Sequence, residues 1–215
     1  MITEAQEKQL AGLRESIKDY IGGKRLSHTY GVEREITKLA ELYAPELEFE
    51  LRAAALLHDI TKPLSLDEQL ELCDKYGIQY TSGDRLMPKT FHAQTACEVI
   101  RRKFPEFFTE TVYSAVLYHT TGQADMSIAE KLLYLADYIE DTRTFDDCVK
   151  LRKFFWDGIS AAHGEDERNN VLRDTLILSF DMTIRGLIDD GTPIHRDTVE
   201  ARNFLIEEKE FEKQQ

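Results

Sequence analysis

The sequence predicts an all-α fold, and three observations support this prediction. Apolar residues recur at the three- and four-residue spacing of amphipathic helices over most of the 215 residues. Convincing strand patterns, in which apolar and polar residues alternate, are absent. The 11 glycines and 5 prolines fall mostly between the helical patterns, where they end helices and form turns. We therefore expect one domain, a helical bundle with a helical elaboration at its C-terminal end.

Caps and helix breakers set the boundaries of the first helices. The opening amphipathic helix ends at Gly22, and Ser27 is the expected N-cap of the next. Pro63 stops the third helix, Ser65 caps the fourth, and the glycine- and proline-containing segment 77–90 is a loop. The expected helices are 4–21, 27–43, 51–60, 65–76, 91–103, 107–119, 127–140, 146–157, 166–190 and 196–212.

The C-terminal helices are expected to belong to the same domain. Residues 166–190 carry apolar side chains on one broad face, which must pack against the preceding helices. We expect residues 1–24 to form an N-terminal helix packed on the domain, 25–203 to form the main domain, and 204–215 to be a solvated helix end.

Composition excludes several classes of protein. The sequence is 42% hydrophobic and 31% charged, which is typical of a globular protein. No apolar run reaches the ~18–20 residues that cross a bilayer, and no signal peptide is recognisable, so we expect a cytoplasmic protein. The net charge of −13 disfavours nucleic-acid polymers and anionic membranes as partners. A homodimer is left open by the sequence.

Ionisable residues stand at the ends of three strongly apolar helices. His58 and Asp59 end one, His119 ends another, and Asp137 interrupts a third. A salt bridge is the ordinary explanation for one isolated buried acid. However, neither acid has a lysine or arginine on its own buried stretch, whereas histidines accumulate. The pattern therefore favours a divalent metal, which neutralises carboxylates and binds neutral imidazoles together.

Three segments carry a resemblance to a known superfamily. Residues 25–28, 54–62 and 135–140 place His28, then the adjacent His58 and Asp59, then an Asp in a fixed order. In this order and setting the chain resembles the HD superfamily of metal-dependent phosphohydrolases, which are all-helical. Histidines between the second and third segments are similar to the two extra ligands that some subfamilies use for a second metal. The metal ligands that the resemblance implies are His28, His58, Asp59, His92, His119 and Asp137.

Four further segments narrow the resemblance. Residues 91–93, 118–122, 136–143 and 193–203 are similar to the YqeK-type family, the symmetrical bis(5′-nucleosyl)-tetraphosphatases. The resemblance implies two divalent metals, with iron as the expected ion and manganese or cobalt as alternatives. One metal would be held by His28, His58, Asp59 and Asp137, and the other by His92, His119 and Asp59.

The expected catalytic residues are Asp59, which bridges the metals, and Lys62, one turn beyond His58. Lys62 would contact a phosphate oxygen or protonate the leaving group, and its alternative role is to stabilise a helix end. The expected substrate-binding cations are Arg25, Lys62, Arg143 and Arg202. Each arginine has a surface ion pair as its alternative.

The expected reaction is hydrolysis of diadenosine tetraphosphate and water to two ADP, by attack of a metal-bridging hydroxide on phosphorus. Another HD-type reaction is the first alternative, on a nucleotide monophosphate, (p)ppGpp or a cyclic nucleotide. A non-catalytic nucleotide-binding regulator is the second. The remaining histidines, His163 and His195, lack an acidic or histidine context and are not assigned to the site.

Overall fold

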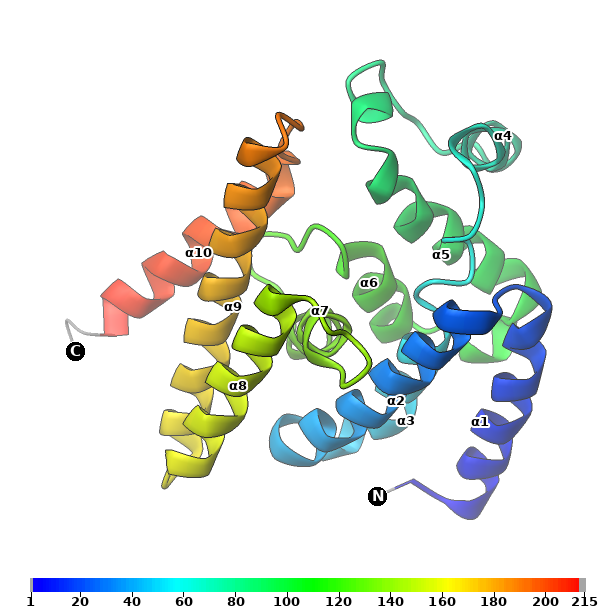
Figure 1. Ribbon diagram of the computed structural model, residues 1–215. Helices are drawn as coiled ribbons and strands as arrows, with labels where there is room; N and C mark the ends of the chain where they lie inside the picture. The colour runs from blue at the N-terminus through cyan, green and yellow to red at the C-terminus, as the bar shows by residue number, and fades with distance from the viewer. Residues whose placement is uncertain (1, 213–215) are drawn as a thin grey trace.

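A computed structural model describes residues 2–212, and within them it contains ten α-helices, five short 3-10 helices and no strand (Figure 1). The helices are α1 (Glu4–Ser16), α2 (Gly23–Tyr43), α3 (Glu48–Leu57), α4 (Leu66–Tyr76), α5 (Phe91–Lys103), α6 (Glu110–Tyr118), α7 (Ile128–Ile139), α8 (Asp146–Ala161), α9 (Glu165–Asp189) and α10 (Arg196–Glu212). The all-α prediction is confirmed. None of these helices is long and apolar enough to cross a membrane.

Side-chain caps fix several helix starts. The hydroxyl of Ser65 accepts from the backbone amide of Glu68, whose carboxylate accepts from the amide of Ser65 at 2.7 Å. Ser127 and Glu130 form the same reciprocal pair at the start of α7. At the other end of α4, Gly77 takes the left-handed conformation with φ 74°. These local signals explain why the expected boundaries of α4 and α7 lie within one residue of the observed ones.

The prediction that Ser27 caps the second helix is wrong. Helix α2 begins at Gly23, directly after its N-cap Gly22, so the glycine pair makes the break by itself. Ser27 lies inside the helix, where its hydroxyl donates to the carbonyl oxygen of Gly23 at 3.4 Å. A serine that bonds back to the preceding turn is tolerated within a helix, and sequence alone does not distinguish it from a cap.

Helix α7 lies at the centre of the fold, with the N-terminal helices on one side and α8 to α10 on the other (Figure 1). It packs against α2, α3, α6 and α8. Its apolar residues are buried on all sides, as are those at the end of α3, because both helices are surrounded by others. Asp59 just after α3 is therefore buried, and Asp137 on α7 is half-buried.

The two ends of the chain both pack on this assembly. Leu10 and Leu13 of α1 are buried, and α1 contacts α3. Helix α9 packs against α8 and α10, and Leu205 of α10 is buried, while Phe211 near its end is 64% exposed. The division of the chain at residues 25 and 203 stays a prediction, and residues 213–215 of the expected helix end lie outside the described residues.

Gly122, in the turn between α6 and α7, has φ 65° and lies against both C-terminal helices. A Cβ atom here would lie 2.6 Å from Phe180 of α9 and 3.0 Å from Ala201 of α10. We expect Gly122→Ala to lower the free energy of unfolding by about 2 kcal/mol or more, because it adds left-handed backbone strain to overpacking. Urea unfolding followed by circular dichroism measures the change.

Gly12 is the matched control for this substitution. It is exposed within α1, and a Cβ atom there would meet nothing within 4 Å. Gly12→Ala should raise the free energy of unfolding by ~0.5–1 kcal/mol, because alanine loses less backbone entropy in a helix. If the two substitutions had the same effect, the contact of Gly122 with α9 and α10 would not be the cause.

Candidate metal centre

His58 and His119 are each oriented by the carbonyl end of a buried helix. His58 directly follows α3 and His119 directly follows α6. The Nδ1 of His58 lies 2.7 Å from the carbonyl oxygen of Ala55, and the Nδ1 of His119 lies 2.6 Å from that of Val116. A carbonyl oxygen only accepts, so each Nδ1 carries the proton and donates. Each Nε2 therefore keeps its lone pair for a metal.

His28 of α2 is oriented by a carboxylate instead. Its Nδ1 lies 3.0 Å from Oε1 of Glu140, which is fully buried and also accepts from the backbone amide of Thr142 at 2.7 Å. Its Nε2 lies 2.9 Å from Oδ1 of Asp137. Burial by itself would lower the pKa of His28, but the two carboxylates raise it to about 9. Gly31 permits this arrangement, because a Cβ atom there would overlap the Glu140 carboxylate.

The Asp59 carboxylate lies among four imidazole rings. Its Oδ1 lies 3.2 Å from Nε2 of His92 and 3.7 Å from Nε2 of His119. Its Oδ2 lies 3.5 Å from Nε2 of His58 and 3.8 Å from Nε2 of His28. Together with Asp137, whose Oδ1 lies 3.7 Å from Nε2 of His58, the six expected ligands gather in one place.

Two overlapping groups within this cluster have the spacing of a metal site. One donor atom from each of His28, His58 and Asp137 lies within 4.8 Å of the others, and the same holds for His58, Asp59 and His119. The Nε2 of His58 and Oδ1 of Asp59 are buried and make no hydrogen bond. Inward-facing imidazole nitrogens and carboxylate oxygens without hydrogen bonds fit divalent metal ions.

The protonation states of His58, His92, Asp59 and Asp137 also suit metal binding, whereas His28, with its pKa raised to about 9, must lose a proton to bind a metal. Burial lowers the pKa of His58 to about 4 and that of His92 to about 3, although Asp59 beside both rings opposes this change. Burial alone would raise the pKa of Asp59 and Asp137. The attraction of His58 for Asp59, and of Arg143 for Asp137, instead holds both pKa values well below the usual range. Neutral rings and ionised carboxylates are the forms that bind metals.

Both acids have basic partners, which are among the cations expected from the sequence to contact phosphate. Arg25 donates to Oδ2 of Asp59 at 2.6 Å, and Arg143 donates to Oδ1 of Asp137 at 2.6 Å. Lys62 places its Nζ 3.1 Å from Nε2 of His92, one of the expected ligands. Asp59 and Asp137 therefore each form a salt bridge, although neither has a basic residue on its own buried stretch of sequence. Arg25 comes from α2 and Arg143 from the turn after α7, and both salt bridges coexist with the histidine contacts.

Arg202 is not part of this arrangement in the described structure. It lies on α10 and donates to Oδ1 of Asp181 on α9 at 2.5 Å. In the sequence it is not distinguishable from Arg25 or Arg143, because all three arginines lie in segments that resemble the family. Its role as a phosphate contact stays a prediction, and an ion pair is what the structure gives it.

A buried polar network supports the turn that follows Asp59. The hydroxyl of Thr61 donates to the carbonyl oxygen of His92 at 2.9 Å, and the amide of Gln69 donates to the carbonyl oxygen of Thr61 at 2.6 Å. Thr95 in turn donates to Oε1 of Gln69 at 2.5 Å. The network ties the turn to α4 and α5 and so fixes His92 relative to Asp59. Sequence reasoning missed it, because threonine and glutamine carry no distinctive pattern.

A cavity of about 530 Å³ adjoins the centre. Thr120 lines it, and its hydroxyl lies 3.3 Å from Nε2 of His92 and 3.2 Å from Nε2 of His119. Helices α9 and α10 and the segment between them form its far wall, which includes His195. His195 was not assigned from the sequence, and its place in the family-like segment 193–203 was the signal that could have found it. The C-terminal helices therefore form one side of a cavity beside the histidine and aspartate cluster.

The HD domain family matches residues 25–142, more than half of the chain, and this range contains all six clustered ligands. The chain belongs to the HD-domain family. A solved structure from Clostridium acetobutylicum, described as a predicted HD superfamily hydrolase involved in NAD metabolism, is 32% identical with a TM-score of 0.78. The similarity covers 92% of this chain and 97% of that one.

Curated relatives define a narrower family. A symmetrical bis(5′-nucleosyl)-tetraphosphatase from Halalkalibacterium halodurans is 30% identical over 196 residues, which cover 90% of this chain and 95% of the relative. The enzyme of the same name from Bacillus subtilis is 26% identical over 201 residues, covering 94% and 97%. Within the HD domains, this chain is thus a member of the symmetrical bis(5′-nucleosyl)-tetraphosphatase family.

The geometry of Glu140 predicts an effect on metal affinity. We expect Glu140→Gln to weaken divalent metal binding by at least about tenfold, because the neutral amide no longer supports His28 as a ligand. Competition with a coloured chelator measures the affinity. Gly31→Ala should weaken it as well, since the added methyl group displaces the Glu140 carboxylate.

Glu35→Gln is the matched control. Glu35 is also a buried acid, but it accepts from the indole of Trp156 at 2.7 Å, away from the cluster. We expect its substitution to leave metal affinity unchanged. A similar loss of affinity in Glu35→Gln and Glu140→Gln would contradict a specific role for Glu140.

Proposed function

We propose that this protein hydrolyses dinucleoside tetraphosphates symmetrically, so that diadenosine tetraphosphate and water give two ADP. The observation that carries the proposal is the Asp59 carboxylate, which lies within 3.2–3.8 Å of the Nε2 atoms of four histidines. The full-length similarity to enzymes of that name supports the choice of substrate. In the reaction, water oxygen bonds to one central phosphorus, the bridging P–O bond breaks, and a proton goes to solvent.

We further propose that the cluster holds two divalent metal ions, iron first and manganese or cobalt as alternatives. His28, His58, Asp59 and Asp137 would bind one ion, and His92, His119 and Asp59 the other. Bound metals would supply an activated water and neutralise charge on the attacked phosphate. The orphaned Nε2 of His58 and Oδ1 of Asp59 support this assignment.

The basic residues around the cluster would hold the polyphosphate. Arg25 is 36% exposed and Arg143 is 27% exposed, so each faces its buried carboxylate on one side and solvent on the other. Their guanidinium groups suit non-bridging phosphate oxygens. Lys62 stands beside His92, where its ammonium group could contact the phosphate and give a proton to the leaving ADP.

The nucleotide would enter from the adjoining cavity. Its walls include the aromatic ring of Tyr138 and the apolar side chains of Met182 and Leu187, which suit a base and ribose. Thr120 joins this cavity to the imidazoles of the cluster. A nucleoside bound there would have its phosphates extending toward Asp59.

We also place the reaction in the cytoplasm. Cys73, Cys97 and Cys148 are all buried free thiols, as expected in a reducing compartment. The acidic composition disfavours a nucleic-acid polymer or an anionic membrane as the partner, and a small nucleotide would need positive charge concentrated at its site.

Product analysis tests the proposed reaction. Protein purified anaerobically and reconstituted with ferrous iron should convert diadenosine tetraphosphate to ADP alone, as resolved by anion-exchange chromatography. His58→Ala and Asp59→Ala should reduce turnover to background while helical circular dichroism is retained, because each removes a proposed ligand.

His163→Ala is the control for these variants, since His163 lies in the loop before α9 and outside the cluster. It should keep wild-type turnover. AMP and ATP as products would contradict a symmetrical cut, and turnover retained in Asp59→Ala would contradict the metal assignment. Nucleotide binding without any product would support a regulator instead.

Removing single cations tests the phosphate contacts. We expect Lys62→Ala and Arg143→Ala to lower kcat/KM by about 10²-fold, a typical cost of losing one charge-stabilising donor. Arg202→Ala should change it by less than about threefold, because its guanidinium is paired with Asp181. Initial rates at matched metal content measure the difference. An equal loss in Arg202→Ala would show that Arg202 does bind phosphate.

A further inference from the structure

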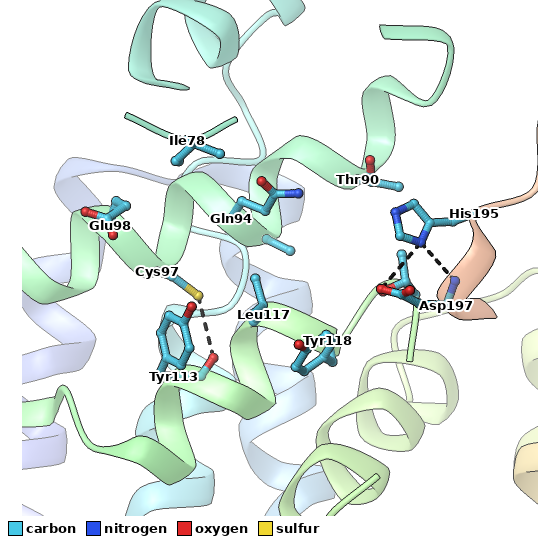
Figure 2. Close-up of a pocket in the computed structure, with 12 residues that line it drawn as sticks. Ile78, Thr90, Gln94, Cys97, Glu98, Tyr113, Leu117, Tyr118, His195 and Asp197 are labelled. Atoms are coloured by element: carbon cyan, nitrogen blue, oxygen red, sulfur yellow. Dashed lines mark hydrogen bonds and ion pairs between the residues drawn. The ribbon is translucent and has the colours of Figure 1, made fainter. Parts of the chain in front are cut away.

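A second cavity, of about 350 Å³, lies beside the first. Figure 2 shows it between Gln94 of α5 and Leu117 and Tyr118 of α6, with His195 and Asp197 at one end. Its volume is at the lower end of the roughly 300–1,000 Å³ typical of small-molecule pockets. The proposed function assigns no part of the substrate to this cavity.

The two cavities meet next to the metal centre. Thr90, Thr121 and His195 line both of them, so these residues form the boundary. Thr121 follows Thr120, whose hydroxyl contacts the Nε2 atoms of His92 and His119. A ligand that extends from one cavity into the other therefore passes the edge of the metal cluster.

The lining of the second cavity suits a nucleoside better than a phosphate. Neither lysine nor arginine is among its described lining residues, which include Asp197, and its other acid, Glu98, is ion-paired with Arg101 and Arg102. Carboxylates repel phosphate but accept hydrogen bonds from ribose hydroxyls and from an exocyclic amine. Gln94 adds an amide that can donate and accept, and the ring of Tyr118 offers a face for a base.

Symmetrical cleavage also requires a site that accommodates two nucleosides. The broken bond lies at the middle of the tetraphosphate, so one nucleoside diphosphate must extend on each side of this bond. We infer that the second cavity binds the second nucleoside of the substrate, with His195 and Thr121 between the two nucleoside sites. This inference rests on the proposed function and deepens it, because it explains how the enzyme positions the central bond rather than an outer one.

Two uncleavable ligands that differ by one adenosine provide the test. The first is diadenosine tetraphosphate with a methylene group between the two central phosphorus atoms, and the second is adenosine tetraphosphate with the same methylene group. Isothermal titration calorimetry of the full-length, manganese-loaded protein should show at least about tenfold tighter binding of the first. Gln94→Ala and Asp197→Ala should each remove most of this difference and should change binding of the second ligand by no more than about twofold.

Two exposed residues on the same helices serve as controls, Lys103 of α5 and Arg196 of α10. Lys103→Ala and Arg196→Ala should keep the full preference for the two-nucleoside ligand. The inference is overturned if wild type shows no preference, or if Gln94→Ala and Asp197→Ala weaken both ligands equally.

The outcome separates this inference from the proposed function. A protein that cleaves diadenosine tetraphosphate to ADP but shows no preference between the two ligands would overturn the second nucleoside site alone. A protein that shows the preference, and loses it in Gln94→Ala and Asp197→Ala, but forms no product would keep the site and overturn the proposed reaction.

Discussion

The elements around the site are organised around the buried carboxylate of Asp59. Removing a partner from a buried ion pair typically costs about 3–5 kcal/mol, so such a group must be surrounded by compensating atoms. Here Arg25 of α2 donates to the Asp59 carboxylate, and four imidazoles contributed by α2, α5 and the ends of α3 and α6 surround its oxygens. Because these elements must all present a polar atom to the same point, their packing angles and end positions are constrained together.

Most of the fold was predictable, whereas only part of the site was. Long amphipathic patterns and capping serines locate helices because both act within a few residues. The apolar setting of His58, Asp59 and Asp137 likewise signals buried charge. Arg25 pairs with Asp59 across 34 residues of sequence, and Glu140 contacts His28 across 112, so both contacts depend on tertiary packing. One sequence signal did point to Glu140, because it is an acid at the end of the same apolar helix as Asp137.

The clustered ligands and the walls of the two cavities come from different parts of the chain. The HD match ends at residue 142 and contains every clustered ligand. Both cavities, however, use His195 from the segment before α10, and the larger one also uses α9. In the proposed function, the cluster in the HD region would carry the chemistry, and the helices that follow it would determine which substrate reaches the cluster.

The turn after α6 concentrates several roles in consecutive positions. His119 faces the cluster, Thr120 lines the larger cavity, Thr121 lies at the boundary of both, and Gly122 packs on Phe180. Loops on protein surfaces commonly accept insertions and deletions during evolution. In this turn a change of one residue in length would shift every role by one position at once. Natural variation in this family should therefore preserve the length of the turn even where its sequence drifts.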